Sequence, residues 1–334
     1  MGARDELDQA LHPKRTGDLD AAVLALEALL GRRPAHPLAL AHLADVQIRR
    51  GRIDEATAAL DRAEEAAGTT TFTSRLRGDL HYRAGRFRDA ARAYEVADAL
   101  GEKGAWHLVQ LARCRLRLRD LEGARGAALR AVEREPSQAA GWLVLGDVAA
   151  REQRFAVAED MYSRAHDAAP GDGFAYAKLV EARLLRLPPE ARSREVEVLL
   201  KTTGRGNRHL EAVLARMRSA QGDTGAAAEA WGHTAAEHGD PYSRRMHGFS
   251  LRKAGRLDEA AAVLWRCLAD EPHNIPVFRA YIAVQRDRGA FEELRRTLEA
   301  ILPRAGARRG AYYGELRKLP APRAPDTESG SRPR

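Results

Sequence analysis

Cysteine is scarce in this sequence, since the 334 residues include only Cys114 and Cys267. Two cysteines cannot build a disulfide framework, and neither lies in the C-x-x-C or Cys/His spacing that is typical of a metal site. Long apolar runs are missing too: no stretch of about eighteen apolar residues occurs, and the charged residues 1–20 leave no room for the apolar core of a signal peptide. We therefore expect a protein of the reducing cytoplasm, without a secretion signal or a membrane span.

Aromatic residues are also few, at 6%, whereas 44% of the residues are apolar and most of these are Ala or Leu. Ala and Leu favour helices, and the β-branched and aromatic residues that favour strands are in the minority. This composition predicts an all-α fold. The basic residues are almost all arginine, with six lysines among 55 Lys plus Arg, and they give a formal net charge of +8.

One short phrase recurs along most of the chain, as in residues 51–56 (GRIDEA) and 255–260 (GRLDEA). The phrase ends at residues 22, 56, 90, 124, 158, 192, 227, 260 and 294, so that every step is 34 residues except one of 35 and one of 33. Self-similarity at a fixed period of this length is the signature of a repeat architecture. Each unit is too small to bury both of its faces, and neighbouring units must stack to form a core.

The repeating unit resembles that of the tetratricopeptide repeat (TPR) family. The family consensus has a large apolar residue at position 4, a small one at 8, Gly near 15, Ala at 20, an aromatic residue or Leu at 24, a small one at 27 and often Pro at 32. The copy that starts at Ala139 follows this pattern with Trp142, Leu145, Gly146, Phe155, Ala158, Tyr162, Ala165 and Pro170. The resemblance spans about residues 3–306.

The resemblance implies an all-α, right-handed superhelical solenoid of about nine helix-turn-helix repeats with a C-terminal capping helix. Repeats are expected to start near residues 3, 37, 71, 105, 139, 173, 208, 241 and 275 and to fill residues 3–306. Residues 307–318 are predicted to form the capping helix, and residues 319–334, which are rich in Pro and Arg, a disordered tail. Pro13 is expected to damage the first helix of the first repeat, and we interpret residues 204–206 (GRG) as a loop.

The sequence contains no nucleotide-binding, zinc-protease or nucleophile-elbow motif. The eleven histidines are scattered, and the nearest pair, His233 and His238, is five residues apart and so predicted to lie off a common helix face. We therefore expect no catalytic residues, no cofactor and no metal site, and we interpret the chain as a protein that is not an enzyme.

In the TPR family, the first helices of successive repeats line a concave groove, chiefly through positions 2, 5, 6, 9, 12 and 13. In this sequence, sixteen of the residues at these positions are basic and six are acidic, which gives an excess of ten positive charges, while the rest of the chain carries a net charge of −2. A concave basic wall attracts anionic ligands. The alternative is that an arginine-rich genome has simply filled solvated positions.

Position 2 adds aromatic residues to this charge, and the predicted partner-binding residues combine both kinds of side chain. They are Arg75, Asp79, Tyr82, Arg83, Arg113, Arg117, Arg151, Arg245, Arg252, Phe72, Trp106, Phe174 and Tyr242. Aromatic residues beside arginines suit peptide recognition, and they also suit stacking on nucleic-acid bases. Packing between repeats is the alternative role for each aromatic residue.

The leading hypothesis is a non-catalytic scaffold or adaptor that binds an acidic or extended protein segment in its basic groove. One alternative is binding of RNA or single-stranded DNA by the same arginines, which a steep salt dependence would reveal. Another is an accessory subunit for a modification or biosynthetic enzyme encoded elsewhere. The groove shows charge without a recognisable recognition code, and the sequence names no particular partner.

Overall fold

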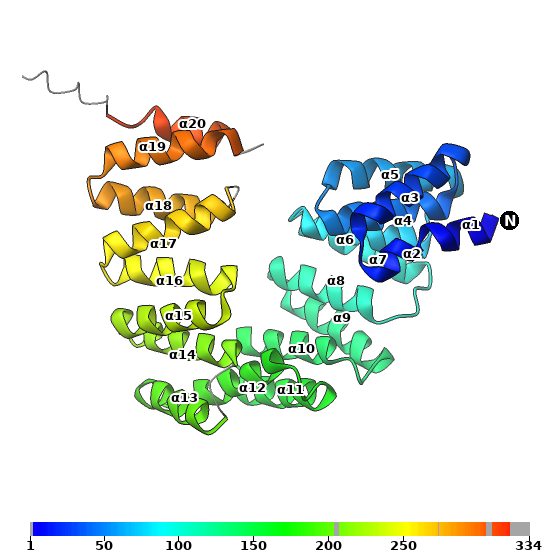
Figure 1. Cartoon of the computed structure of the whole chain (residues 1–334). Coiled ribbons are helices and arrows are strands. Elements are labelled where there is room, and N and C mark those ends of the chain that lie inside the picture. The colour runs from blue at the N-terminus through cyan, green and yellow to red at the C-terminus, as the bar shows by residue number, and fades with distance from the viewer. Residues whose placement is uncertain (1–2, 204–206, 273, 305–308, 321–334) are drawn as a thin grey trace, which may run out of the picture. The chain divides into compact units, whose positions relative to one another are not determined.

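The structure is a computed structural model that describes residues 3–203, 207–272, 274–304 and 309–320. The chain forms two compact units, Met1–Arg186 and Leu187–Arg334. The helices of the first unit are α1 (Ala3–Ala10), α2 (His12–Thr16), α3 (Leu19–Arg32), α4 (Pro37–Arg50), α5 (Ile53–Ala67), α6 (Thr71–Arg83), α7 (Phe87–Ala99), α8 (Trp106–Arg117), α9 (Leu121–Arg134), α10 (Ala139–Arg151), α11 (Phe155–Ala168) and α12 (Gly173–Leu185) (Figure 1).

The second unit continues the same alternation of helices. It contains α13 (Pro189–Thr203), α14 (Arg208–Ala220), α15 (Thr224–His238), α16 (Pro241–Lys253), α17 (Leu257–Asp270), α18 (Ile275–Asp287), α19 (Phe291–Ile301), a 3₁₀ turn η1 (Leu302–Arg304) and α20 (Arg309–Leu316). Consecutive helices pack against each other in pairs, as α4 does with α5 and α16 with α17 (Figure 1). The predicted all-α solenoid of helical hairpins is thereby confirmed.

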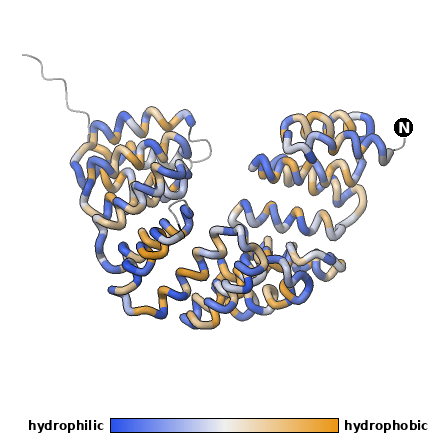
Figure 2. The backbone as a smooth tube through the Cα atoms, turned by 60° about the horizontal axis from the view of Figure 1, so that its bottom comes forward, coloured by the Kyte–Doolittle hydropathy of each residue, from blue (hydrophilic) through white to orange (hydrophobic). Residues whose placement is uncertain are grey.

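Each helix buries one stripe of its surface. In α6, for example, Leu76 and Leu80 are fully buried, whereas Arg75 and Asp79 are only half-buried. Figure 2 shows the result as hydrophobic and hydrophilic residues that alternate along the helices of each unit. The spacing of three to four residues between apolar positions is what places them on one helix face.

The turns of the hairpins need a residue in the left-handed backbone conformation. Gly51, with φ 76°, fills this place between α4 and α5, as other glycines do in most repeats. In two repeats the same place is taken by Arg119, with φ 63°, and Gln153, with φ 59°. Residues that carry a Cβ adopt this conformation at a cost of about 1 kcal/mol, so these two turns are locally strained.

Small residues at position 8 allow the two helices of a hairpin to approach closely. At Gly78, an added Cβ would lie 2.4 Å from the ring of Tyr94, and at Gly146 it would lie 2.3 Å from the ring of Tyr162. Both tyrosine rings are buried. Glycine is therefore required at these two positions by the packing of the tyrosine against the helix backbone.

The connection between α7 and α8 is held by an ionic cluster around Asp98. The carboxylate accepts hydrogen bonds from Arg130 (2.5 Å), Arg134 (2.9 Å) and the buried ring of His107 (3.1 Å). Burial alone would raise the pKa of Asp98, but these three donors outweigh it and lower the pKa to about 2. The cluster joins the end of α7 to α8 and α9.

The two ends of the array differ from the regular repeats. Pro13 lies in the first turn of α2, where its missing N–H is tolerated, and the first helix of the first repeat is split into α1 and α2. At the other end, Tyr312 of α20 is fully buried and its ring lies 4.2 Å from that of Phe278, while Tyr313 is exposed. Residues 307–308 of the predicted capping helix, residues 321–334 of the predicted tail and the predicted loop 204–206 lie outside the described residues.

The two cysteines lie one in each unit, and both are buried as free thiols: Cys114 in α8 and Cys267 in α17. Burial raises the pKa of the Cys114 thiol to about 12. Burial also raises the pKa of Cys267. Both side chains therefore serve as small apolar core residues.

Candidate binding site

A cleft of about 550 Å³ opens in the first unit along α4, α6 and α8. It is lined by Asp45, Ile48, Arg49, Arg75, Asp79, Tyr82, Arg83, Tyr94, Trp106, Gln110 and Arg113. Six of the residues predicted to bind a partner therefore line one cleft: Arg75, Asp79, Tyr82, Arg83, Trp106 and Arg113. These six are brought together from two helices, α6 and α8.

The helical period explains why α6 supplies so many of these residues. Asp79 lies four residues after Arg75, and Tyr82 and Arg83 follow Asp79 by three and four residues, which places all four toward one face of the helix. The opposite face carries the apolar residues that pack into the core. A helix with one buried stripe thus presents a continuous row of polar side chains to the cleft.

Asp79 is an anchored acceptor within the cleft. The Tyr94 hydroxyl donates a hydrogen bond of 2.6 Å to the Asp79 Oδ1, and the Arg75 Nη1 lies 3.7 Å from the Oδ2. Burial raises the pKa of Asp79 above its ordinary value, although the Tyr94 hydrogen bond and the charge of Arg75 oppose this. Burial and the nearby Asp79 carboxylate raise the pKa of Tyr94 as well, so its hydroxyl remains a donor.

Asp45 is neutralised by two cations of the protein itself. Lys14 Nζ lies 2.6 Å from Asp45 Oδ2, and Arg49 Nε lies 3.3 Å from Oδ1. Burial would raise the pKa of Asp45, but Lys14 and the neighbouring arginines outweigh it and lower the pKa. Lys14 also contacts the ring of His42 at 3.0 Å, and burial together with this charge lowers the pKa of His42 to about 4. The negative charge of Asp45 is thus compensated by cations of the protein itself.

Arg83 and Arg113 form no ion pair among the described residues, although both line the cleft. Arg83 is exposed and Arg113 is half-buried. Trp106, at the start of α8, lines the same cleft and exposes 45% of its surface. With four arginines against two carboxylates, the cleft combines an excess of positive charge with an accessible indole ring.

Other predicted residues of the first unit are held in contacts elsewhere. Arg151 Nη1 donates a hydrogen bond of 2.8 Å to the carbonyl oxygen of Leu116, and the Arg117 guanidinium lies 5.9 Å from the centroid of the Phe87 ring. Phe72 is half-buried against the core. Phe174 is exposed and has the Lys178 Nζ at 5.7 Å from its ring.

Three predicted residues lie in the second unit and also have partners there. Arg245 donates two hydrogen bonds to the Glu271 carboxylate, at 3.0 and 3.1 Å. Arg252 lies 3.9 Å from the Asp287 carboxylate. The Tyr242 ring packs edge-on against Trp231, at 5.7 Å between centroids. The charge of Arg245 in particular is compensated within the protein.

Five residues that line the cleft were absent from the predicted set. Asp45, Ile48, Arg49 and Gln110 occupy inner positions of the repeat, so the register itself contained the signal for them. Tyr94 comes from the second helix of its repeat. Its ring packs over Gly78, and this packing places the Tyr94 hydroxyl within hydrogen-bond distance of Asp79.

Among the residues that the structure describes, no three His, Cys, Asp or Glu side chains are arranged to hold a metal ion. Likewise, no helix in the described ranges is both long and apolar enough to cross a membrane.

Two family models match the sequence. The model described as a tetratricopeptide repeat-like domain matches residues 2–121, and the tetratricopeptide repeat model matches residues 109–173. None of the curated proteins matches the sequence. Proteins of the TPR family are generally non-catalytic scaffolds that bind proteins or peptides.

Solved structures show the same fold at low sequence identity. A tetratricopeptide repeat protein from Parabacteroides merdae is 15% identical with a TM-score of 0.59, and the match covers 75% of this chain and 98% of that one. The Pseudomonas aeruginosa protein pilF is 16% identical with a TM-score of 0.52, and the match covers 60% of this chain and 91% of that one. The repeats, the family models and the shared fold together identify the chain as a tetratricopeptide repeat protein.

Proposed function

We propose that the protein is an adaptor whose first unit binds an acidic, extended segment of a partner protein in the cleft along α4, α6 and α8. The observation that carries this proposal is that Arg83 and Arg113, which form no ion pair among the described residues, line the same cleft as the exposed Trp106. Arginine and tryptophan are the residues that contribute most binding energy at protein interfaces. Carboxylates of the partner would form ion pairs with the two guanidinium groups, and an apolar side chain of the partner would cover the indole ring of Trp106.

The electrostatics of the cleft favour an anionic ligand over a neutral one. Asp45 is already paired with Lys14 and Arg49, and Asp79 with Tyr94, so neither carboxylate is available to bind a cation. The remaining excess of arginine makes the cleft positive, and opposite charge speeds the encounter of partners and fixes their register.

The test is binding of a fluorescein-labelled peptide that alternates Glu with Leu, measured by fluorescence anisotropy. A peptide with Gln in place of Glu supplies the neutral comparison. The double variant Arg83→Glu, Arg113→Glu is expected to weaken binding of the acidic peptide by about tenfold or more, because paired interface charges contribute on the order of 1.5 kcal/mol or above.

A matched control uses Arg88 and Arg92, which are exposed on α7 outside the cleft. The change Arg88→Glu, Arg92→Glu alters the net charge by the same amount, and it should leave the affinity within about twofold. Equal losses in the two double variants would show nonspecific attraction and overturn the proposal. A single-stranded oligonucleotide that binds more tightly than the peptide, with the same dependence on Arg83 and Arg113, would assign the cleft to nucleic acid instead.

A further inference from the structure

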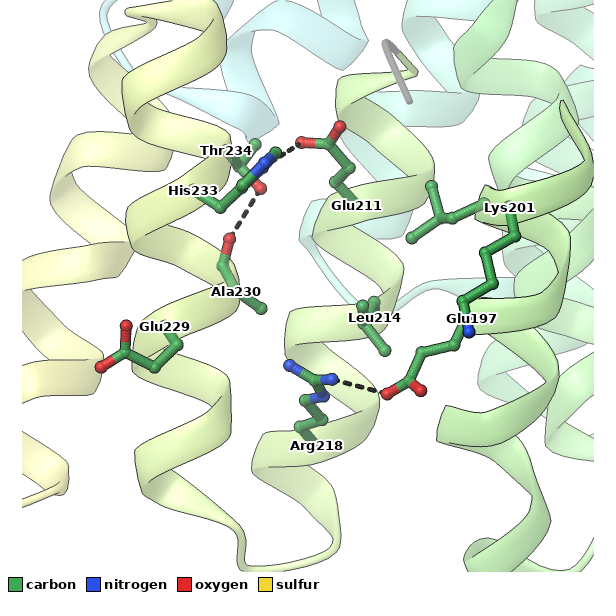
Figure 3. Close-up of a pocket in the computed structure, with 10 residues that line it drawn as sticks. Glu197, Lys201, Glu211, Leu214, Arg218, Glu229, Ala230, His233 and Thr234 are labelled. Atoms are coloured by element: carbon green, nitrogen blue, oxygen red, sulfur yellow. Dashed lines mark hydrogen bonds and ion pairs between the residues drawn. The ribbon is translucent and has the colours of Figure 1, made fainter. Parts of the chain in front are cut away.

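A second cavity, of about 420 Å³, lies within the second unit between α13, α14 and α15 (Figure 3). Its apolar lining residues include Leu200, Leu214 and Ala230, and its charged ones are Glu197, Glu211, Glu229, Lys201 and Arg218. Acidic side chains outnumber basic ones by one here, whereas basic side chains are in excess in the cleft of the first unit. The cavity is built entirely from residues of the second unit.

Glu211 departs from the consensus of its repeat. It occupies position 4, where Leu40, Leu108 and Phe278 are buried apolar residues, although Glu6, Ser74 and Arg244 are also polar at this position. Glu211 is buried as well, with 6% of its surface exposed. A carboxylate thus lies where three other repeats bury an apolar side chain, and burial of a charge is costly unless it is paired and hydrogen-bonded.

The protein does not supply that hydrogen bonding. Neither carboxylate oxygen of Glu211 accepts a hydrogen bond among the described residues. Two imidazole rings lie close to the Oε2, with His238 Nε2 at 3.3 Å and His233 Nδ1 at 3.7 Å, but neither donates to it. Figure 3 shows Glu211 and His233 pointing toward each other across α14 and α15. Although five residues separate them, both histidine rings of α15 reach the same carboxylate, and His238 is the last residue of the helix.

The other two glutamates of the cavity already have arginine partners. Arg218 Nη2 lies 2.5 Å from the Glu197 carboxylate, and Arg256 pairs with Glu229. Both of these ion pairs are formed within the second unit. Of the three carboxylates, Glu211 is the one that lacks a cationic donor with hydrogen-bond geometry.

We propose that this cavity receives a lysine or arginine side chain of a partner polypeptide and that Glu211 binds its cationic head group. Leu200 and Leu214 would cover the methylene stem, as apolar surfaces commonly do for these long side chains. His233 covers the carboxylate in this structure, and because 41% of its side chain is exposed, the ring has room to turn aside. A charge-assisted hydrogen bond to a buried carboxylate is among the stronger polar contacts in proteins.

The experiment titrates the ¹⁵N-labelled full-length protein with two short peptides and follows the amide signals of α15 by NMR. One peptide carries a single arginine between alanines, and the other carries citrulline, which has the same shape without the charge. The arginine peptide is expected to shift the signals around Ala230 and His233 and to bind at least about tenfold more tightly than the citrulline peptide. Equal binding of the two peptides would overturn the proposal.

The variant Glu211→Gln removes the charge while keeping the shape, and it should weaken binding of the arginine peptide by roughly tenfold or more. The matched control is Glu237→Gln on the exposed side of α15, which should leave binding unchanged. Glu211→Leu introduces the apolar residue that Leu40 and Leu108 supply at this position in two other repeats. It should therefore raise the melting temperature and abolish binding, which separates loss of the site from loss of the fold. Undiminished binding by Glu211→Gln would refute the role of this carboxylate.

Two further outcomes distinguish this site from its competitors. Lys201 also lines the cavity. If Lys201→Ala bound the arginine peptide and the wild type did not, the occupant would be the protein's own lysine and the proposal would fail. The double variant Arg83→Glu, Arg113→Glu should leave this binding unchanged, so a failure of the cleft in the first unit would not be mistaken for a failure here.

Discussion

Two repeats of the first unit contain the same pair of a buried tyrosine and an aspartate, and a comparison between them tests how such a carboxylate is stabilised. Tyr94 donates to Asp79 at 2.6 Å, and Tyr162 donates to Asp147 at 2.7 Å. Asp147 has a second donor, Lys178 Nζ, at 2.9 Å. For Asp79, the nearest nitrogen of Arg75 lies 3.7 Å away, which is beyond hydrogen-bond distance.

We predict that Tyr94→Phe costs about 1.5–3 kcal/mol of unfolding free energy, whereas Tyr162→Phe costs about 1 kcal/mol. Each change removes a single oxygen atom and leaves the ring in place over its glycine, so no cavity adds to the cost. Removal of the Tyr94 hydroxyl leaves the half-buried Asp79 carboxylate without a donor at hydrogen-bond distance among the described residues. After Tyr162→Phe, Asp147 keeps Lys178, and 36% of its side chain remains exposed to water.

Urea unfolding followed by circular dichroism measures the difference, and both variants report on the same unit. The cost of Tyr94→Phe should also depend on pH. Because burial raises the pKa of Asp79 in the folded protein, its contribution to stability is largest below the unfolded pKa of about 4 and is lost as the pH rises through the folded value. Lowering the pH should therefore reduce the cost of Tyr94→Phe. Equal costs for the two variants at neutral pH would refute the reasoning.

Three further predictions concern packing, backbone strain and acid stability. Gly78→Ala should lower the melting temperature, because overpacking of the new Cβ against Tyr94 costs about 1–3 kcal/mol and exceeds the gain from the helix preference of Ala. Gly126→Ala, whose Cβ would meet no atom within 4 Å, should raise the melting temperature. Gln153→Gly should stabilise the protein in thermal melts by up to about 1 kcal/mol by relieving the positive φ. Asp98→Asn should destabilise the protein at pH 7, and the difference should vanish in urea titrations as the pH falls from about 4 to 2, because the pKa of Asp98 is lowered to about 2 and its contribution is lost on protonation.

The helices and their pairing could be predicted from the sequence because the same local sequence signals recur in most repeats. A Gly at the turn, a Pro after the second helix and a small residue at position 8 all act locally, so a 34-residue register is enough to place them. The same register placed six residues of the cleft on two helices. These residues face the same cleft because of their helical spacing, which can be read from the sequence.

The pairing of the charges could not be predicted in this way. Arg151 and Arg245 occupy inner positions like Arg113, but one donates to a carbonyl oxygen and the other to Glu271. These partners come from other helices, and their distances depend on side-chain rotamers that a repeat pattern does not contain. Glu211 was missed for a related reason. Glu6, Ser74 and Arg244 are also polar at position 4, so only its burial beside two histidines, which the sequence does not show, distinguishes it.

The distribution of the cysteines gives each unit one buried thiol whose reactivity reports on the opening of that unit. Cys114 reports on the first unit and Cys267 on the second, and a buried thiol reacts with a labelling reagent only when its surroundings open. The rate at which each thiol is modified would thus measure the opening of its own unit in the intact, unmutated chain. A ligand that holds one unit closed would slow one of the two reactions and leave the other unchanged.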